Sequence, residues 1–559
     1  MRIAPALLAF ALLPAMAVSQ SGRTSAGSRQ KIAEPRLSAA QTEVLQQARA
    51  QMETGDLKTA EDLVRSLLLQ VPHSPDAHNL LGIISERQGK HMAADREYRE
   101  SLRLKPSFDN ARRNLAHLLM TEGKLDAAQT QYQRLIKQSP ADVDARYGYA
   151  VLLVQAQKFS EAIAQLEVLI KSRPSDAQTA LLYISSLLHA NRSQDAKIAA
   201  DQLAKTNSND PKVLFSLGLT LAEAEQYRSA MQCFARVNQL KPETPDVLYN
   251  LGLAAYNLKD YDHATEALAK AADLAPQLPE NHFRLGLISS ERGDNLNAVI
   301  EFQHAIDHAP NDAEYHYLLG RENFAVGNWE IAAKSYQRAT ELDPHKAIYF
   351  LNLGDALFRA EDYVGATNAF EAAQKIDPNT PEIEYLIGYG YRAQSHLEKA
   401  REHFERQLQV DPKHVNASAN LGWVLLQEDK LPQARACLEK ALQTAAENVD
   451  ARYDLANVDA KSKQIDQAIE QYLRVLDFSP DHMRAHYQLF LLYSRNKQND
   501  KAQVELAEYQ RLQDMEKMVL RAESQLRKIR RVRTPNDTDT SAQPGMPAQP
   551  PLPPPGSSR

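Results

Sequence analysis

Histidines spaced four residues apart come closest, in this chain, to a constellation that could do chemistry. His304 and His308 form one such pair, and His482 and His486 form a second. Residues four apart share one face of a helix, so either pair could hold a metal ion together with a third ligand. No third ligand follows at a fixed spacing, and we therefore expect these histidines to face solvent.

Short motifs that bind nucleotides or activate a nucleophile do not occur in the sequence. G-x-x-x-x-G-K-[ST], H-E-x-x-H and G-x-S-x-G are absent, and Gly388-Tyr389-Gly390 is only a fragment of G-x-G-x-x-G. Carboxylates are abundant, as expected of charged helix surfaces, but the pattern gives no sign that two of them converge. We therefore predict that the protein is not an enzyme and has neither a cofactor nor a metal.

The sequence repeats at a fixed interval, which equals the number of residues from Ala60 to Ala94. The repeats must therefore position every functional group. Alanine recurs at this interval fourteen times, from Ala60 to Ala502, without insertion or deletion. Proline follows the same register eleven times between Pro72 and Pro480 and is missing at only two of the expected positions. A fixed period of this size is typical of stacked helical repeats, in which each unit buries its apolar face against its neighbours.

Residues 245–278 illustrate how one repeat should fold. Apolar residues recur at helical spacing in the first half, and Gly252 is small at the point where two helices must cross closely. Lys259-Asp260 supplies the turn, and residues 261–274 form a second amphipathic helix. Each repeat is therefore predicted to be a helical hairpin.

The pattern resembles the tetratricopeptide repeat, a family that favours an aromatic-Asn-Leu-Gly run in the first helix and a small Ala in the second. Three such runs are Tyr249-Asn250-Leu251-Gly252, Phe350-Leu351-Asn352-Leu353-Gly354 and Ala419-Asn420-Leu421-Gly422. The resemblance covers residues 41–482 as thirteen repeats, with 483–516 as a partial fourteenth. It implies an all-α fold, a right-handed α-solenoid of helix-turn-helix repeats.

The repeat at residues 177–210 departs from this pattern. Ile184 stands at the small crossing position, Ala200 at the aromatic position of the second helix, and Ser208 at the proline position. Such a repeat should pack less regularly, which predicts a local bend or soft point there. A diverged but well-packed repeat is the alternative.

The last repeat leads into a different kind of helix. Phe490 replaces the small crossing residue, and six apolar residues then follow at steps of three and four: Leu512, Met515, Val519, Ala522, Leu526 and Ile529. We expect residues 483–533 to form a partial repeat and a capping helix that projects beyond the stack. The same spacing would also suit a short coiled coil.

Charge is divided unevenly along the chain. Residues 517–533 contain seven Lys and Arg residues against Glu523 alone, a net charge of +6. Because the whole chain carries −6, the remainder carries −12, and this acidic body argues against nucleic acid binding. Residues 534–559 are rich in proline and are expected to be a disordered tail.

The N-terminus has the features of a secretory signal peptide at residues 1–17. Arg2 precedes an apolar stretch that is too short to span a bilayer, and Ala15-Met16-Ala17 offers a cleavage site. Residues 18–40 would then form a flexible leader. We expect an exported protein, periplasmic or secreted, with an uncleaved anchor as the alternative.

The family resemblance implies a concave groove, lined by the first helices, that holds peptides or partner helices. The fifth position of these helices is aromatic in eight repeats: Tyr147, Phe215, Tyr249, Phe283, Tyr317, Tyr385, Tyr453 and Tyr487. These rings could form a column of contacts along the groove, or they could serve packing alone.

Relatives that bind C-terminal carboxylates use a clamp of Asn with Lys and Arg across three repeats. Of the candidate central asparagines, only Asn250 is followed in the next repeat by a suitable arginine, Arg284, and Glu280 occupies the place of its companion lysine. A carboxylate clamp is therefore not predicted. The predicted binding residues are Tyr147, Phe215, Tyr249, Asn250, Phe283, Arg284, Tyr317, Asn352, Tyr385, Asn420 and Tyr453.

These features predict a non-enzymatic protein–protein interaction scaffold of the bacterial envelope, with other proteins or peptides as partners. One alternative is the regulatory or substrate-recruiting subunit of a separate enzyme. Another is an envelope adaptor for secretion or polysaccharide export, tethered by weak electrostatic contact of residues 517–533 with membrane or cell wall. The oligomeric state is left open.

Overall fold

A computed structural model describes residues 37–533 of the chain, with side chains described as far as residue 522. The predicted signal peptide, residues 18–36 of the predicted leader and the tail 534–559 lie outside the described residues. Helices and turns make up the described part, which contains no strand. None of its helices has the length and apolar character needed to cross a membrane. The protein is thus an all-α helical repeat solenoid, as the sequence predicts.

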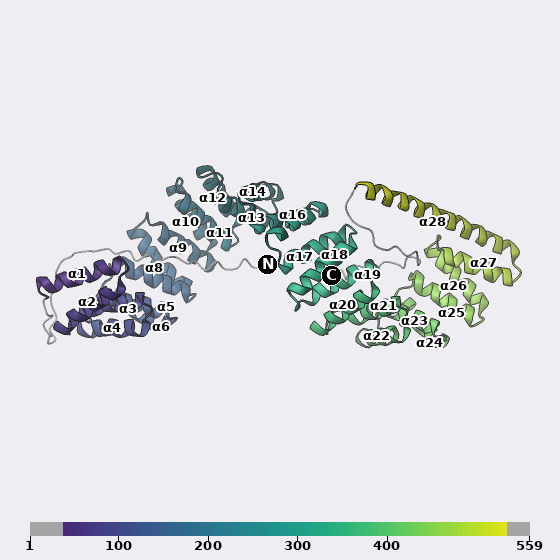
Figure 1. Cartoon of the computed structure of the whole chain (residues 1–559), viewed down its shortest axis with the longest axis horizontal. Helices are drawn as coiled ribbons and strands as arrows, with labels where there is room; N and C mark the ends of the chain where they lie inside the picture. The colour runs from purple at the N-terminus through teal and green to yellow at the C-terminus, as the bar shows by residue number, and fades with distance from the viewer. Residues whose placement is uncertain (1–36, 534–559) are drawn as a thin grey trace. The chain divides into compact units, whose positions relative to one another are not determined.

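The helices divide into two compact units, Met1–Pro310 and Asn311–Arg559 (Figure 1). In each unit, hairpins follow one another, and we call the first helix of every hairpin its A helix and the second its B helix. The described helices of the first unit are α1 (Ala39–Glu53), α2 (Leu57–Gln70), α3 (Pro75–Arg87), α4 (His91–Leu104), α5 (Asp109–Thr121), α6 (Leu125–Gln138), α7 (Val143–Gln155), α8 (Phe159–Ser172), α9 (Ala177–His189), α10 (Ser193–Thr206), α11 (Pro211–Glu223), α12 (Tyr227–Leu240), α13 (Pro245–Asn257), α14 (Tyr261–Leu274), α15 (Pro279–Glu291) and α16 (Asn295–His308).

The second unit ends in a hairpin whose B helix is far longer than the others. The described helices of this unit are α17 (Ala313–Ala325), α18 (Trp329–Leu342), α19 (Ala347–Arg359), α20 (Tyr363–Ile376), α21 (Ile383–Ala393), α22 (Leu397–Val410), α23 (Val415–Gln427), α24 (Leu431–Thr444), α25 (Val449–Lys461), α26 (Ile465–Phe478), α27 (Met483–Arg495) and α28 (Asn499–Arg533). The fourteenth repeat therefore has both of its helices, and α28 runs unbroken for 35 residues.

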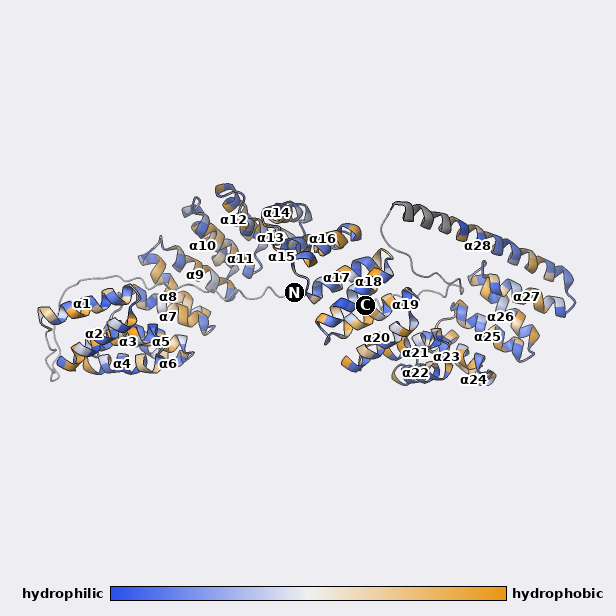
Figure 2. Ribbon diagram, in the orientation of Figure 1, coloured by the Kyte–Doolittle hydropathy of each residue, from blue (hydrophilic) through white to orange (hydrophobic). Residues whose placement is uncertain are grey.

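Within each unit, the A helices lie on the inner side of the stack. Most A helices contact the A helix of a neighbouring hairpin in the same unit. For example, α3 contacts α5, and α23 contacts α25. No comparable contact joins two B helices in the described part of either unit. The exposed side of the A helices is therefore the concave one. Figure 2 shows that each helix carries both apolar and polar residues, as stacking on one side and solvent on the other require.

Most hairpins are closed by a crossing pair: a small residue on the A helix and the residue sixteen positions later on the B helix. At Gly286, a Cβ atom would lie 2.6 Å from a ring carbon of Phe302, whose side chain is fully buried. Glycine thus lets the two helices approach until the ring fills the space between them. The same arrangement joins Gly82 to Tyr98, Gly218 to Phe234, Gly320 to Tyr336, Gly354 to Phe370 and Gly388 to Phe404.

The divergent repeat, α9 with α10, inverts the sizes of this pair. Ile184 on the A helix is fully buried, and Ala200 on the B helix is 5 % exposed in the same apolar cluster. A large residue opposite a small one fills the crossing in either order, which supports the well-packed alternative for this repeat. The local bend stays a prediction.

Every described hairpin turns through one residue in the left-handed backbone region, at the same register of the repeat. Lys259 is one of them, with φ of 59°, at the turn predicted from the sequence. Glycine adopts this conformation at little cost, whereas other L residues lose about 1–2 kcal/mol there. The residues are Gly55, Gly89, Gly123, Gln157, Asn191, Glu225, Lys259, Gly293, Gly327, Glu361, Ser395, Asp429, Lys463 and Lys497.

In several repeats, a side chain near the start of the A helix makes a hydrogen bond or ion pair with a side chain on the B helix of the same hairpin. We call this contact a polar bridge, and it was not predicted from the sequence. It joins side chains nineteen residues apart, at distances of 2.6 to 3.1 Å, in seven repeats. In several repeats the A-helix side chain also reaches the carbonyl of the preceding turn, as His78 Nε2 reaches Pro72 O at 3.0 Å. The bridges are His78–Glu97, Arg112–Gln131, Arg146–Gln165, His282–Glu301, Glu384–His403, Arg452–Gln471 and His486–Glu505.

His486 shows that the expectation of solvent-facing histidines was wrong for one of the spaced pairs. Its side chain is buried, with Nδ1 2.6 Å from Glu505 Oε2 and Nε2 2.9 Å from Pro480 O. His482 is half-buried, and its Nδ1 accepts a hydrogen bond from the backbone N–H of Ala485 at the start of α27. The first pair, His304 and His308, is exposed as predicted.

The crossing pair gives a stability prediction. We expect Gly286→Ile to lower the free energy of unfolding by about 1–3 kcal/mol, because the Phe302 ring leaves no room for the new side chain. The double variant Gly286→Ile with Phe302→Ala reproduces the Ile184–Ala200 arrangement and should recover part of the loss. Urea unfolding followed by circular dichroism measures both. A double variant less stable than Gly286→Ile alone would show that the pair does not act as a unit.

Candidate protein-binding surface

All of the binding residues predicted from the sequence lie on A helices. In the first unit they are Tyr147 on α7, Phe215 on α11, Tyr249 and Asn250 on α13, and Phe283 and Arg284 on α15. In the second unit they are Tyr317 on α17, Asn352 on α19, Tyr385 on α21, Asn420 on α23 and Tyr453 on α25. Within each unit, they therefore belong to the helices that form the concave side.

The predicted aromatic residues contact the B helix of their own hairpin and, in several repeats, a ring of the next repeat, as Tyr317 stacks on Tyr349 with centroids 4.8 Å apart. The ring centroid of Phe215 lies 5.6 Å from that of Phe234, and that of Tyr453 lies 5.6 Å from that of Tyr472. Phe283 and Tyr385 are only 5 % and 3 % exposed. These two side chains serve packing and leave almost no area for a partner, whereas Tyr147, Phe215, Tyr249, Tyr317 and Tyr453 stay partly exposed.

The predicted polar residues differ in what they contact. Asn250 donates to the carbonyl of Asp246 in its own helix at 2.7 Å, a local bond that carries no information on a partner. Asn352 donates to the Tyr317 hydroxyl at 3.1 Å and so links two neighbouring A helices. The Arg284 guanidinium lies 5.5 Å from the Phe283 ring centroid. Asn420 belongs to a larger group of polar and aromatic side chains.

That group, which we call the Arg392 cluster, consists of Tyr389, Arg392, Asn420, Trp423 and Asp454. The guanidinium of Arg392 lies 4.3 Å from the Trp423 ring centroid and 5.7 Å from that of Tyr389. One of its terminal nitrogens donates to Asn420 Oδ1. The cluster therefore joins α21, α23 and α25, three successive A helices that contact one another.

The Arg392 cluster also contains an unsatisfied polar group. The Arg392 Nε is buried and has no hydrogen-bond partner in the part of the chain that the structure describes. A buried donor without an acceptor costs stability, and the Nε atoms of Arg112, Arg284 and Arg452 are buried without a partner in the same way.

Two carboxyl groups on the A helices of the second unit have raised pKa values. Burial raises the pKa of Asp454 to about 7, against the attraction of Arg392 and with the support of the nearby Asp450. Burial likewise raises the pKa of Asp355 to about 6, opposed by Arg359. Both side chains keep some solvent exposure, as expected on a concave surface where protein surrounds a group on most sides. At neutral pH, Asp454 can therefore either donate or accept a hydrogen bond.

Sequence reasoning missed the Arg392 cluster, although part of its pattern is visible. Asp355, Tyr389, Trp423 and Asn457 occupy the same position in four successive repeats, one helical turn beyond the predicted aromatic column. A search for a second column of large or polar residues at the repeat interval would have found them. Arg392 follows no such column, and only the contact between neighbouring A helices places it beside Trp423.

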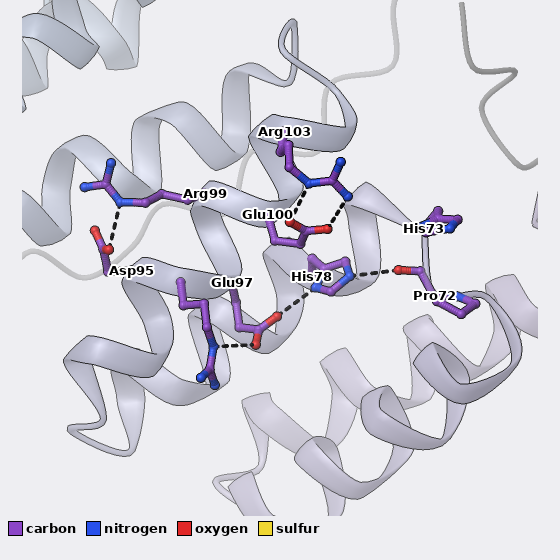
Figure 3. A pocket seen from close by; sticks show the side chains of 9 residues that line it. Pro72, His73, His78, Asp95, Glu97, Arg99, Glu100 and Arg103 are labelled. Carbon is purple, nitrogen blue, oxygen red and sulfur yellow. Dashed lines mark hydrogen bonds and ion pairs between the residues drawn. The ribbon is translucent and has the colours of Figure 1, made fainter.

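On the B-helix side of the first unit, a hollow of about 740 Å³ lies between α3 and α4. Figure 3 shows His78 between the Glu97 carboxylate and the Pro72 carbonyl, with Arg99 turned to Asp95 and Arg103 turned to Glu100. These charges satisfy one another and show no arrangement for a ligand. Among the described residues, no group of three His, Cys, Asp or Glu side chains could hold a metal ion.

Comparison with protein families agrees with the repeat pattern. Two sequence models, both described as tetratricopeptide repeat, match residues 45–107, 113–177, 152–212 and 317–381, and residues 391–442 and 425–478. A model of subunit 3 of the anaphase-promoting complex, or cyclosome, matches residues 189–271. No curated protein matches the sequence.

Several solved structures are similar to this chain at low sequence identity. Yeast Tom70 is 18 % identical, covers 76 % of this chain and 96 % of its own, and has a TM-score of 0.30. MamA from Desulfovibrio magneticus RS-1 is 23 % identical over 31 % of this chain and 97 % of its own, with a TM-score of 0.29. The C-terminal part of a repeat protein from Cytophaga hutchinsonii is 18 % identical over 43 % of this chain and 99 % of its own, with a TM-score of 0.38.

The raised pKa of Asp454 predicts a pH-dependent stability. The unfolded chain releases this proton near pH 4 and the folded chain near pH 7, so wild-type protein loses stability as the pH rises between these values. Asp454→Asn should remove that loss and be more stable than wild type at pH 8 by about 1–2 kcal/mol, a gap limited by solvent screening. Urea unfolding at pH 4 and pH 8 measures the difference.

A matched control is Glu447→Gln, which removes an exposed carboxylate just before α25. It should change the free energy of unfolding by no more than about 0.5 kcal/mol at either pH. Equal stability of wild type and Asp454→Asn at pH 8 would mean that the carboxylate is not desolvated in the folded chain.

Proposed function

The chain is a tetratricopeptide repeat protein, a family whose helical hairpins form protein-interaction scaffolds, and we propose that it binds extended segments of partner proteins along its A helices. The Arg392 cluster is the observation that supports this proposal most. It combines a guanidinium, an amide and two aromatic rings on the concave side of one unit. The guanidinium and the amide can form hydrogen bonds with peptide carbonyls, and the aromatic rings can contact side chains of a partner.

The chemistry of the cluster favours a partner that presents oxygen acceptors. Arg392 and Asn420 can bind backbone carbonyls, while Trp423 and Tyr389 offer ring area at low cost in conformational entropy. Asp454, half-protonated near neutral pH, can bind either a donor or an acceptor of the partner. An extended polypeptide supplies all of these groups at regular intervals.

We further propose that this binding takes place outside the cytoplasm, in the bacterial envelope. The support is the N-terminal sequence, in which Arg2, an apolar stretch and Ala15-Met16-Ala17 have the order of a secretory signal. We expect the protein purified from cells to begin just after Ala17. Mass spectrometry of its N-terminal peptide tests this, and an intact Met1 in the mature protein would contradict processing.

Capture of partners from envelope extract tests the binding surface itself. We expect Arg392→Ala with Asn420→Ala to reduce the recovery of crosslinked partners at least tenfold, because the variant removes the charged and amide groups of the cluster. The matched control is Gln409→Ala with Lys440→Ala, which changes two exposed residues on the B helices α22 and α24. Circular dichroism establishes that both variants keep their helices.

The outcomes separate this proposal from its rivals. Loss of partners in both variants, or in neither, would contradict recognition by the A-helix surface. A single enzyme recovered in equal amount with the protein would support the regulatory-subunit alternative in place of a scaffold with several partners.

A further inference from the structure

Helix α28 is much longer than its hairpin needs. The other B helices have fourteen residues, and the first fourteen of α28 suffice to pack on α27. His486 bonds Glu505, the Tyr509 ring centroid lies 5.1 Å from that of Tyr487, and Leu512 is 7 % exposed. After Leu512 the helix continues to Arg533, over a length of roughly 30 Å.

Beyond Leu512, α28 exposes several large apolar side chains, whereas a helix surrounded by solvent is expected to expose polar ones. Met515 is 46 % exposed, Met518 69 %, Val519 56 % and Leu520 59 %. Of these four exposed residues, Met515 and Val519 lie on one helix face, and nothing covers that face in the part of the chain that the structure describes.

The spacing of the apolar residues indicates what covers this face. Leu512, Met515 and Val519 follow one another at steps of three and four, and the sequence continues this pattern at Ala522, Leu526 and Ile529. Strict three-four spacing gives a narrow stripe that fits a second helix. A helix that lies on a lipid surface has a broader apolar face, often with Trp or Phe, and residues 510–533 contain no aromatic residue.

The charges of α28 indicate which helix fits. Residues 499–516 contain five acidic and two basic residues, a net charge of −3, whereas residues 517–533 carry +6. Two copies in antiparallel orientation place the basic half of each towards the acidic half of the other. A parallel pair would place two +6 segments side by side, which is unfavourable.

We propose that residues 515–526 form an antiparallel two-stranded coiled coil with the same segment of a second copy of the chain. In the register that overlaps the two segments fully, Met515 lies opposite Leu526 and Val519 lies opposite Ala522, while Leu512 stays packed on α27. Two interaction scaffolds are then joined at their C-terminal ends. The inference is independent of what the A helices bind.

Molar mass measured by sedimentation tests the proposal. The full chain is expected to shift from monomer to dimer with rising concentration, and the dimer should weaken when salt screens the charges. Val519→Asp should raise the dimer Kd at least tenfold. Leu520→Asp is the matched control, because it introduces the same charge at a site of similar exposure outside the three-four stripe, and it should leave the dimer largely intact.

Orientation is tested by disulfide formation in a background that lacks Cys233 and Cys437. An equimolar mixture of Met515→Cys and Leu526→Cys chains should form mainly mixed disulfides, whereas parallel pairing would give only like-with-like disulfides. A monomer at all concentrations, or a dimer unaffected by Val519→Asp, would overturn the proposal. Salt-sensitive binding of that monomer to vesicles containing an anionic phospholipid would assign α28 to a lipid surface instead.

Discussion

Most hairpins of this protein depend on the crossing pair, in which a large side chain on one helix occupies the room that a small residue on the other leaves. This contact sets the distance between the two helices. It therefore also sets the width of the apolar face that the next hairpin must cover. Because most repeats close in a similar way, neighbouring hairpins meet at a similar offset, and the A helices lie together on one side of each unit. The concave surface is thus a result of side-chain volumes inside the hairpins.

The sequence predicted the hairpins well because their determinants recur in register. Gly286 and Phe302 belong to columns of small and large residues that recur in most repeats, and a left-handed turn residue such as Lys259 recurs in every described hairpin. The polar bridges escaped notice because several residue types fill the same role, with His78, Arg112 and Glu384 at equivalent positions. A repeat search based on identity does not reveal a contact that is preserved only in its chemistry.

The binding surface was harder to predict because it arises between repeats. A residue's register tells which helix face it occupies, but its burial depends on the side chains of the adjacent hairpins. Phe283 and Tyr385 therefore became packing residues although their register matches that of more exposed rings. Arg392 gained its role from Trp423, which belongs to the next repeat and comes close only when the A helices contact each other.

The same crossing also determines how such a chain can change length over evolutionary time. Because the small residue and its ring belong to one hairpin, duplication or deletion of one whole repeat adds or removes a complete crossing and leaves the others intact. An insertion or deletion between a ring and its glycine would separate the two and open a cavity in the core. Growth of the molecule is therefore restricted to whole-hairpin steps, which agrees with the unbroken register from Ala60 to Ala502.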